Sequence, residues 1–118
     1  MMEIMENQEQ KTNKDSLPLE RVFDNPAAKV LDFLLLNQKF DYSESDISNL
    51  ANVPPRTLQR VLPSLLNEKL VARTRKSSKA FMYQANLESK RTLALLEYIK
   101  ATMEENLDRL ELVQKTDN

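Results

Sequence analysis

Residues 46–62 read DISNLANVPPRTLQRVL, and this stretch predicts two short helices joined by a tight turn. Ser43 lies just ahead as a candidate N-cap, with Asp46 three residues on. Pro54 and Pro55 restart the chain after the turn, because proline is favoured in the first turn of a helix. Apolar residues recur at spacings of three and four in both helices, so each helix buries one face. These residues are Ile47, Leu50 and Ala51 in the first helix, and Leu58, Val61, Leu62, Leu65 and Leu66 in the second.

The flanking sequence predicts a helix before this pair, and a β-hairpin and a long helix after it. Asn25 and Pro26 form a helix start, and the apolar spacing carries that helix to residue 37 or 38. A short β-like piece follows at 40–42. Beyond the pair we expect strands at 70–75 and 80–85, a long mobile loop at 76–79, and a helix from about 88 to 113.

This order of elements is that of a winged helix-turn-helix. The expected fold class is α+β, mainly α: a three-helix core, a two-stranded β wing and a long C-terminal dimerisation helix. We divide the chain into a flexible acidic and polar arm (1–20), a winged-helix domain (21–87), the dimerisation helix (88–113) and a flexible tail (114–118). Leu17, Val22 and Phe23 are expected to pack against the domain.

Composition argues against most kinds of catalysis. The 118 residues include no Cys, no His and no Gly. Thiolate or imidazole metal sites, cysteine nucleophiles, P-loops and dinucleotide-binding turns are therefore excluded. We expect no enzyme activity, no cofactor and no bound metal. No apolar run approaches a membrane span, and the acidic start at Met1 does not resemble a secretory signal. The expected location is the cytoplasm, in association with the nucleoid.

Charge is segregated along the chain although the formal net charge is only −1. Residues 54–91 hold nine basic and two acidic side chains, and every other segment is mildly acidic. One contiguous third of the chain is therefore strongly basic, as expected of a nucleic-acid-binding surface.

The paired helices at 46–62 resemble those of winged-helix transcriptional regulators of the MarR/TrmB-like kind, of an archaeal type. Residues 65–71 resemble the exit into the wing, and residues 81–86 the second wing strand. The resemblance covers residues 25–113 and implies a DNA-binding regulator. Such regulators usually carry Gly before the first wing strand and often at the wing tip, where this chain has Lys69 and Ser77-Ser78. Pro63 also lies inside the second helix, where we expect a kink or an early break.

The second helix of the pair is the candidate recognition helix, and it would read double-stranded DNA in the major groove. Arg can pair with guanine, Gln with adenine, and Thr can contact a phosphate or a thymine methyl. The wing would contact the backbone or the minor groove. The candidate contacts are Pro55, Arg56, Thr57, Gln59 and Arg60 on the helix, Arg73, Arg75, Lys76, Ser77, Ser78 and Lys79 on the wing, and Ser43 and Ser45 at the helix cap.

An apolar stripe along the last helix predicts a homodimer with a coiled-coil interface, interrupted at Lys100. The expected interface residues are Leu93, Leu96, Ile99, Met103, Leu107 and Leu110. Two recognition helices would then address half-sites about one turn of DNA apart.

Other interpretations use the same residues. The protein could be an architectural or partition protein that coats DNA, or a winged-helix adaptor that binds other proteins. The basic side chains could form a solvated face or protect a strand edge. Phe40, Phe81 and Tyr83 are interpreted as packing residues, and the acidic groups around Asp41 as solvated or capping charges. The sequence names no small-molecule effector.

Overall fold

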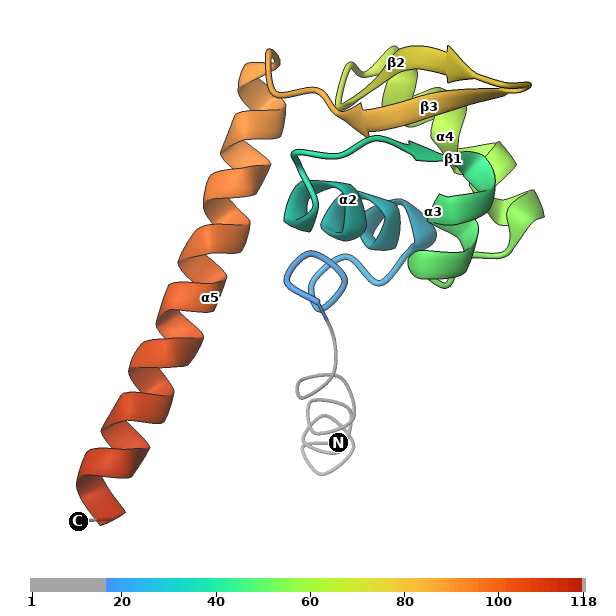
Figure 1. The fold of residues 1–118 in the computed structure, drawn as a ribbon. Helices are drawn as coiled ribbons and strands as arrows, with labels where there is room; N and C mark the ends of the chain where they lie inside the picture. Colours follow the sequence, from blue (N-terminus) through green and yellow to red (C-terminus); the bar gives the residue numbers. More distant parts are fainter. Residues whose placement is uncertain (1–16, 118) are drawn as a thin grey trace.

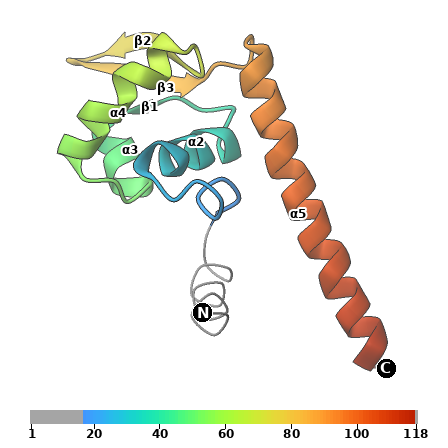
Figure 2. The same ribbon diagram turned by 180° about the vertical axis from the view of Figure 1, so that it is seen from behind.

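The computed structural model describes residues 17–117, with their side chains as far as residue 108. Its elements follow the predicted order (Figure 1). They are α2 (Pro26–Leu36), β1 (Tyr42–Ser43), α3 (Glu44–Leu50), α4 (Pro55–Asn67), β2 (Val71–Ser77), β3 (Ala80–Ala85) and α5 (Lys90–Asp117). Helices α2, α3 and α4 pack with the sheet into one domain, and α5 stands beside that domain and runs past it, as the view from behind also shows (Figure 2). The expected fold class is confirmed.

Two predicted helix caps are present. The Asn25 side chain accepts the backbone N–H of Ala28 at 2.9 Å, and Pro26 occupies the first position of α2. The Ser43 hydroxyl accepts the N–H of Asp46 at 3.2 Å and so begins α3. Each cap satisfies a backbone donor that the first turn of a helix leaves without a partner.

The sheet has three antiparallel strands in the order β1-β3-β2, rather than the two expected for the wing. Tyr42 and Ser43 pair with Tyr83 and Met82, which joins the short β-like piece to the hairpin. The ring of Tyr42 also packs on Phe33 of α2, with centroids 4.8 Å apart. This contact fixes β1 between the helical core and the wing.

The wing tip is a tight turn, so the prediction of a long mobile loop at 76–79 is wrong. Ser77 pairs with Ala80, which leaves only Ser78 and Lys79 in the turn. Two-residue hairpin turns require a residue with positive φ, usually Gly or Asn. Ser78 adopts this conformation with φ of 56°.

Helices α3 and α4 also end on left-handed residues that are not glycine. Asn52 follows α3 with φ of 58°, and Lys69 follows α4 with φ of 62°. In each case the next residue donates its N–H to a carbonyl five positions back: Val53 to Ser48, and Leu70 to Leu65, both at 3.0 Å. This bond is typical of the Schellman motif, which satisfies carbonyls at a helix C-terminus.

Helix α4 continues through Pro63 to Asn67, so the prediction of an early break is wrong. A proline at this position removes the bond to the carbonyl of Gln59. Both Pro63 and Gln59 are exposed, so water can hydrate that carbonyl. Leu62 and Leu65 are buried on the other side and hold the helix against the core.

A turn at residues 17–23, which we call the N-terminal turn, docks on α2 through a buried aspartate. The carboxylate of Asp32 accepts the backbone N–H groups of Leu19 at 2.9 Å and Glu20 at 3.0 Å. Burial raises the pKa of Asp32, while the two amide bonds act in the opposite direction. The side chain of Leu19 is buried beside it. Asp32 therefore has a structural role at a position where it interrupts an apolar run.

Pro18 and Leu19, which precede the predicted domain start at residue 21, are buried. Leu17, Val22 and Phe23 are exposed, so the expectation that they pack against the domain is wrong. Leu19 packs against the domain instead, because the Asp32 carboxylate accepts its backbone N–H. The rest of the predicted arm, residues 1–16, lies outside the described residues.

The predicted interface stripe on α5 is divided between two environments. Leu96 and Ile99 are buried in the core of their own domain, so they are not free to contact a partner. Leu93, Met103 and Leu107 are exposed. The side chain of Leu110 lies outside the described residues. The domain covers only the first part of α5, and the helix then continues past it (Figure 1). This accounts for the exposure of Met103 and Leu107, whereas Leu93 is exposed in the first turn of the helix.

Candidate nucleic-acid interface

The exposed side of α4 carries most of the side chains predicted to read bases. Pro55, Arg56, Gln59 and Arg60 are exposed, and Thr57 is half-buried. The opposite side of the helix, with Leu58, Leu62 and Leu65, is buried in the core. Arg56 and Arg60 are four residues apart, so both guanidinium groups project from the same side of the first two turns. Among the described side chains, no ion pair or hydrogen bond engages either group.

A β-bulge at Thr74 divides the basic side chains of the wing between the two faces of the sheet. Arg73 pairs with Tyr83, but Arg75 pairs with the adjacent Met82, so Thr74 is the extra residue. Paired residues of antiparallel strands share a face, and neighbours in one strand alternate. Arg73 and Arg75 therefore lie on opposite faces, whereas in a regular strand they would share one.

Arg73 and Lys76 share their face of the sheet with two aromatic rings. The Arg73 Cζ lies 4.3 Å from the ring centroid of Phe81 and 5.9 Å from that of Tyr83. The Lys76 Nζ lies 5.6 Å from the Phe81 centroid. Such cation–π contacts restrain a long basic side chain and leave its charge in solvent. Tyr83 packs in the core as predicted, while Phe81 and Phe40 are exposed and that part of the packing prediction is wrong.

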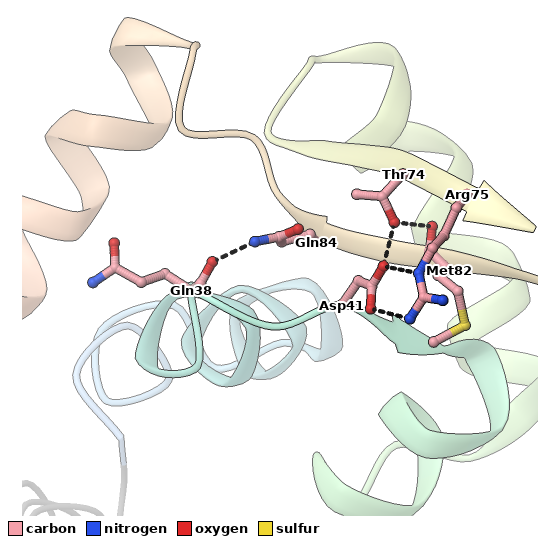
Figure 3. A network of polar contacts seen from close by, with 6 residues as sticks. All are labelled: Gln38, Asp41, Thr74, Arg75, Met82 and Gln84. Atoms are coloured by element: carbon pink, nitrogen blue, oxygen red, sulfur yellow. Dashed lines mark hydrogen bonds and ion pairs between the residues drawn. The ribbon is translucent and has the colours of Figure 1, made fainter. Parts of the chain in front are cut away.

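Arg75 lies on the opposite face and is bound by Asp41, in the loop between α2 and β1 (Figure 3). Its Nε and Nη2 donate to the two carboxylate oxygens of Asp41 at 2.9 and 3.2 Å. The hydroxyl of the bulged Thr74 donates to the same carboxylate at 2.6 Å. Hydrogen bonds from Arg75 and Thr74 lower the pKa of Asp41 to about 2.

The network around Asp41 fastens the wing to the loop before β1. Gln84 of β3 supports the same loop, because its amide nitrogen donates to the Gln38 carbonyl at 2.7 Å (Figure 3). Asp41 is therefore not the solvated or capping charge expected from the sequence, because it binds Arg75 and Thr74 of the wing. No spacing signal could have found this contact, because Asp41 and Arg75 are 34 residues apart.

The start of α3 lies beside the wing tip, across a shallow hollow of about 420 Å³. Ser43, Glu44 and Ser45 line one side of it, and Lys79, Ala80, Phe81 and Tyr83 line the other. The Ser43 hydroxyl already caps α3, whereas Ser45 is exposed. Glu44 also lines the hollows between α3 and α4 and between α4 and the wing. An acidic side chain therefore lies among the predicted DNA contacts of α3, α4 and the wing.

The described residues contain no group of three or more His, Cys, Asp or Glu side chains that could hold a metal ion. Within the same part of the chain, no helix is long and apolar enough to cross a membrane.

The exposed α4, the preceding α3 and the adjacent β-hairpin define a winged helix-turn-helix fold. Solved structures with this arrangement include a mutant of ZitR from Lactococcus lactis and a mutant of MepR from S. aureus, both MarR-type winged-helix regulators. The ZitR structure has a TM-score of 0.59 and 11% sequence identity, and the match covers 98% of this chain and 83% of ZitR. The MepR structure has a TM-score of 0.60 and 18% identity, and covers 96% of this chain and 80% of MepR.

At these sequence identities the structural similarity establishes the fold. It confirms the predicted resemblance to winged-helix regulators at the level of the fold. No protein-family profile matches the chain, and no curated protein sequence does. Both structural neighbours come from bacteria, so the archaeal type stays a prediction.

Proposed function

We propose that the protein is a homodimeric transcriptional regulator that binds specific sites on double-stranded DNA. The observation that carries this proposal is the exposed face of α4, where Arg56, Gln59 and Arg60 project together beside a basic wing. An α-helix fits the major groove, and Arg and Gln are the side chains that pair in a bidentate way with guanine and adenine. Residues near the N-terminus of such a helix reach the base edges.

The wing extends the same positive surface. Arg73 and Lys76 are restrained by the aromatic rings of β3, and Ser77, Ser78 and Lys79 are exposed at the tip. Basic and hydroxyl side chains at a tight tip suit the phosphate backbone and the minor groove. Arg75 adds to this positive field. Asp41 engages its Nε and Nη2, so a phosphate would bind the remaining guanidinium donors or replace the carboxylate.

The second half of α5 supports the homodimer. Met103 and Leu107 continue the apolar stripe that contains the buried Leu96 and Ile99, yet both are exposed. A second copy of α5 would cover them. Two recognition helices in one dimer would then address two half-sites about one helical turn apart.

The proposal is tested by titrating the protein onto a labelled random-sequence duplex by fluorescence anisotropy, at about 50 and 200 mM salt. A dimer that neutralises six phosphates should lose about 10³ in affinity between these concentrations, because binding releases condensed counterions. The Arg56→Ala/Arg60→Ala variant should bind more weakly. Its salt slope should fall by about one for each phosphate contact that is lost.

The matched control is Lys39→Ala/Lys90→Ala, which removes the same charge from exposed positions in the α2–β1 loop and at the first residue of α5. It should bind DNA almost as the natural sequence does. Equal binding by the arginine variant and this control would contradict the proposed interface. Absence of binding at the lower salt concentration would favour a protein-binding adaptor. Cooperative binding to the random-sequence duplex would favour a DNA-coating protein.

A further inference from the structure

The C-terminal end of α4 is closed by groups that come from the start of α5. α4 has no basic residue in its own last turn. Lys69, with positive φ, and Leu70 donate their N–H groups back to Leu66 and Leu65, each at 3.0 Å. The carbonyls of Glu68 and Lys69 follow the last turn of α4 and accept none of these backbone bonds.

Three side chains between β3 and the first turn of α5 supply donors to these two carbonyls. Arg91 Nη2 donates to the Glu68 carbonyl at 2.6 Å, and Arg91 Nη1 pairs with the Glu68 carboxylate at 2.7 Å. The Asn86 amide nitrogen donates to the Lys69 carbonyl at 2.9 Å. The hydroxyl of Thr92, which is fully buried, lies 3.5 Å from the Lys69 carbonyl. We call these five residues the α4–α5 joint.

The α4–α5 joint restrains the angle between α4 and α5 as well as the distance between them. A guanidinium that donates through two nitrogens, to a carbonyl and to a carboxylate, is restrained in its plane. Its positive charge also faces the negative end of the α4 dipole. Leu96 and Ile99 then hold the next turns of α5 against the domain. The direction of α5 is therefore coupled to the direction of α4 through Arg91.

We propose that Arg91 is a positioning residue that sets the spacing of the two half-sites recognised by the dimer. This inference rests on the proposed function, in which α4 reads DNA and α5 forms the dimer. A change of one base pair moves a half-site by about 3.4 Å and turns it by about 35° around the DNA axis. A rigid joint between α4 and α5 discriminates strongly against such a change, and a loose joint tolerates it.

The experiment selects duplexes from a randomised pool with the full-length protein and compares the half-site sequence with the half-site spacing. The variants are Arg91→Met, which removes both bonds, and Arg91→Lys, which keeps the charge without the planar fork. The control is Lys90→Met, which removes an exposed charge from the first turn of α5, beside Arg91; among the described side chains no hydrogen bond or ion pair engages Lys90. Arg91 is also mostly exposed, with 64% of its side chain accessible, so its replacement leaves the core intact.

All four proteins should select the same half-site sequence. Arg91→Met should discriminate between the best spacing and its neighbours about threefold less than the natural sequence does. Arg91→Lys should fall in between, and Lys90→Met should be unchanged. A role of Arg91 in stability alone would lower the bound fraction without broadening the spacing. Two results would overturn the role of Arg91 and leave DNA binding standing. One is that Arg91→Met discriminates between half-site spacings as strongly as the natural sequence does. The other is that the natural sequence selects single half-sites. Failure of the natural sequence to select any site would overturn both proposals.

Discussion

Removing the two exposed side chains of the outer α5 stripe should dissociate the dimer without unfolding the domain. In Met103→Ala/Leu107→Ala, the lost side chains are 48% and 60% exposed in the single chain. Complete burial of such a side chain is worth about 1.5–3 kcal/mol, so pairing with a second copy recovers about 1 kcal/mol for each. Four such side chains in a dimer give about 4 kcal/mol, which corresponds to about 10³ in the dimer dissociation constant.

Sedimentation equilibrium over a range of concentrations measures this constant directly. The matched control is Tyr98→Ala, because Tyr98 is 44% exposed on the same helix. It lies about 140° around the helix axis from Met103, at about 100° per residue. Tyr98→Ala should therefore dimerise as the natural sequence does, and both variants should keep their far-UV circular dichroism. Undiminished association of the double variant, or equal weakening by Tyr98→Ala, would refute the assignment of the interface to this stripe.

Three further predictions concern the contacts that shape the domain. Asp41→Asn should lower the free energy of unfolding at neutral pH, measured by urea titration. Because Arg75 depresses the Asp41 pKa to about 2, the difference in stability between Asp41→Asn and the natural sequence should shrink between pH 4 and pH 2. A difference that stays constant over this range would contradict the ion pair. Asp32→Ala should lower the free energy of unfolding by about 3 kcal/mol and release the N-terminal turn. Leu19→Ala should then destabilise the Asp32→Ala protein little further. Fully additive effects of the two substitutions would contradict the dependence of Leu19 docking on Asp32. Lys69→Gly should raise the free energy of unfolding by about 0.5–1 kcal/mol by relieving a left-handed lysine, whereas Lys69→Ala should give no gain in the same urea titration.

The parts of the fold that depend on local signals could be predicted from the sequence. Asn25 and Ser43 cap their helices because a short polar side chain and the following backbone amides suffice to form the bond. The apolar spacing around Leu58 and Leu62 determined which side of α4 faces solvent, and thereby the candidate site. The order of helices and strands follows from such signals, and with it the winged-helix fold.

The remaining features depend on residues that are distant in the sequence. The wing was predicted as one basic surface, but the bulge at Thr74 and the carboxylate of Asp41 separate Arg75 from Arg73. The tight turn at Ser78 was missed because glycine-free turns have a weak sequence signal. The stripe on α5 has a uniform period, so the sequence could not indicate that the domain buries Ile99 and leaves Leu107 exposed.

The most direct test of the central claim is to map the DNA-bound surface by NMR, following backbone amide shifts as a short duplex is added to the labelled protein. The largest changes should fall in the first two turns of α4, at Arg56 to Arg60, and at the wing tip around Ser78. Amides of the outer α5, around Leu107, should change little. Shifts that cluster on α5 or the N-terminal turn, with α4 unaffected, would contradict the claim that α4 and the wing bind DNA.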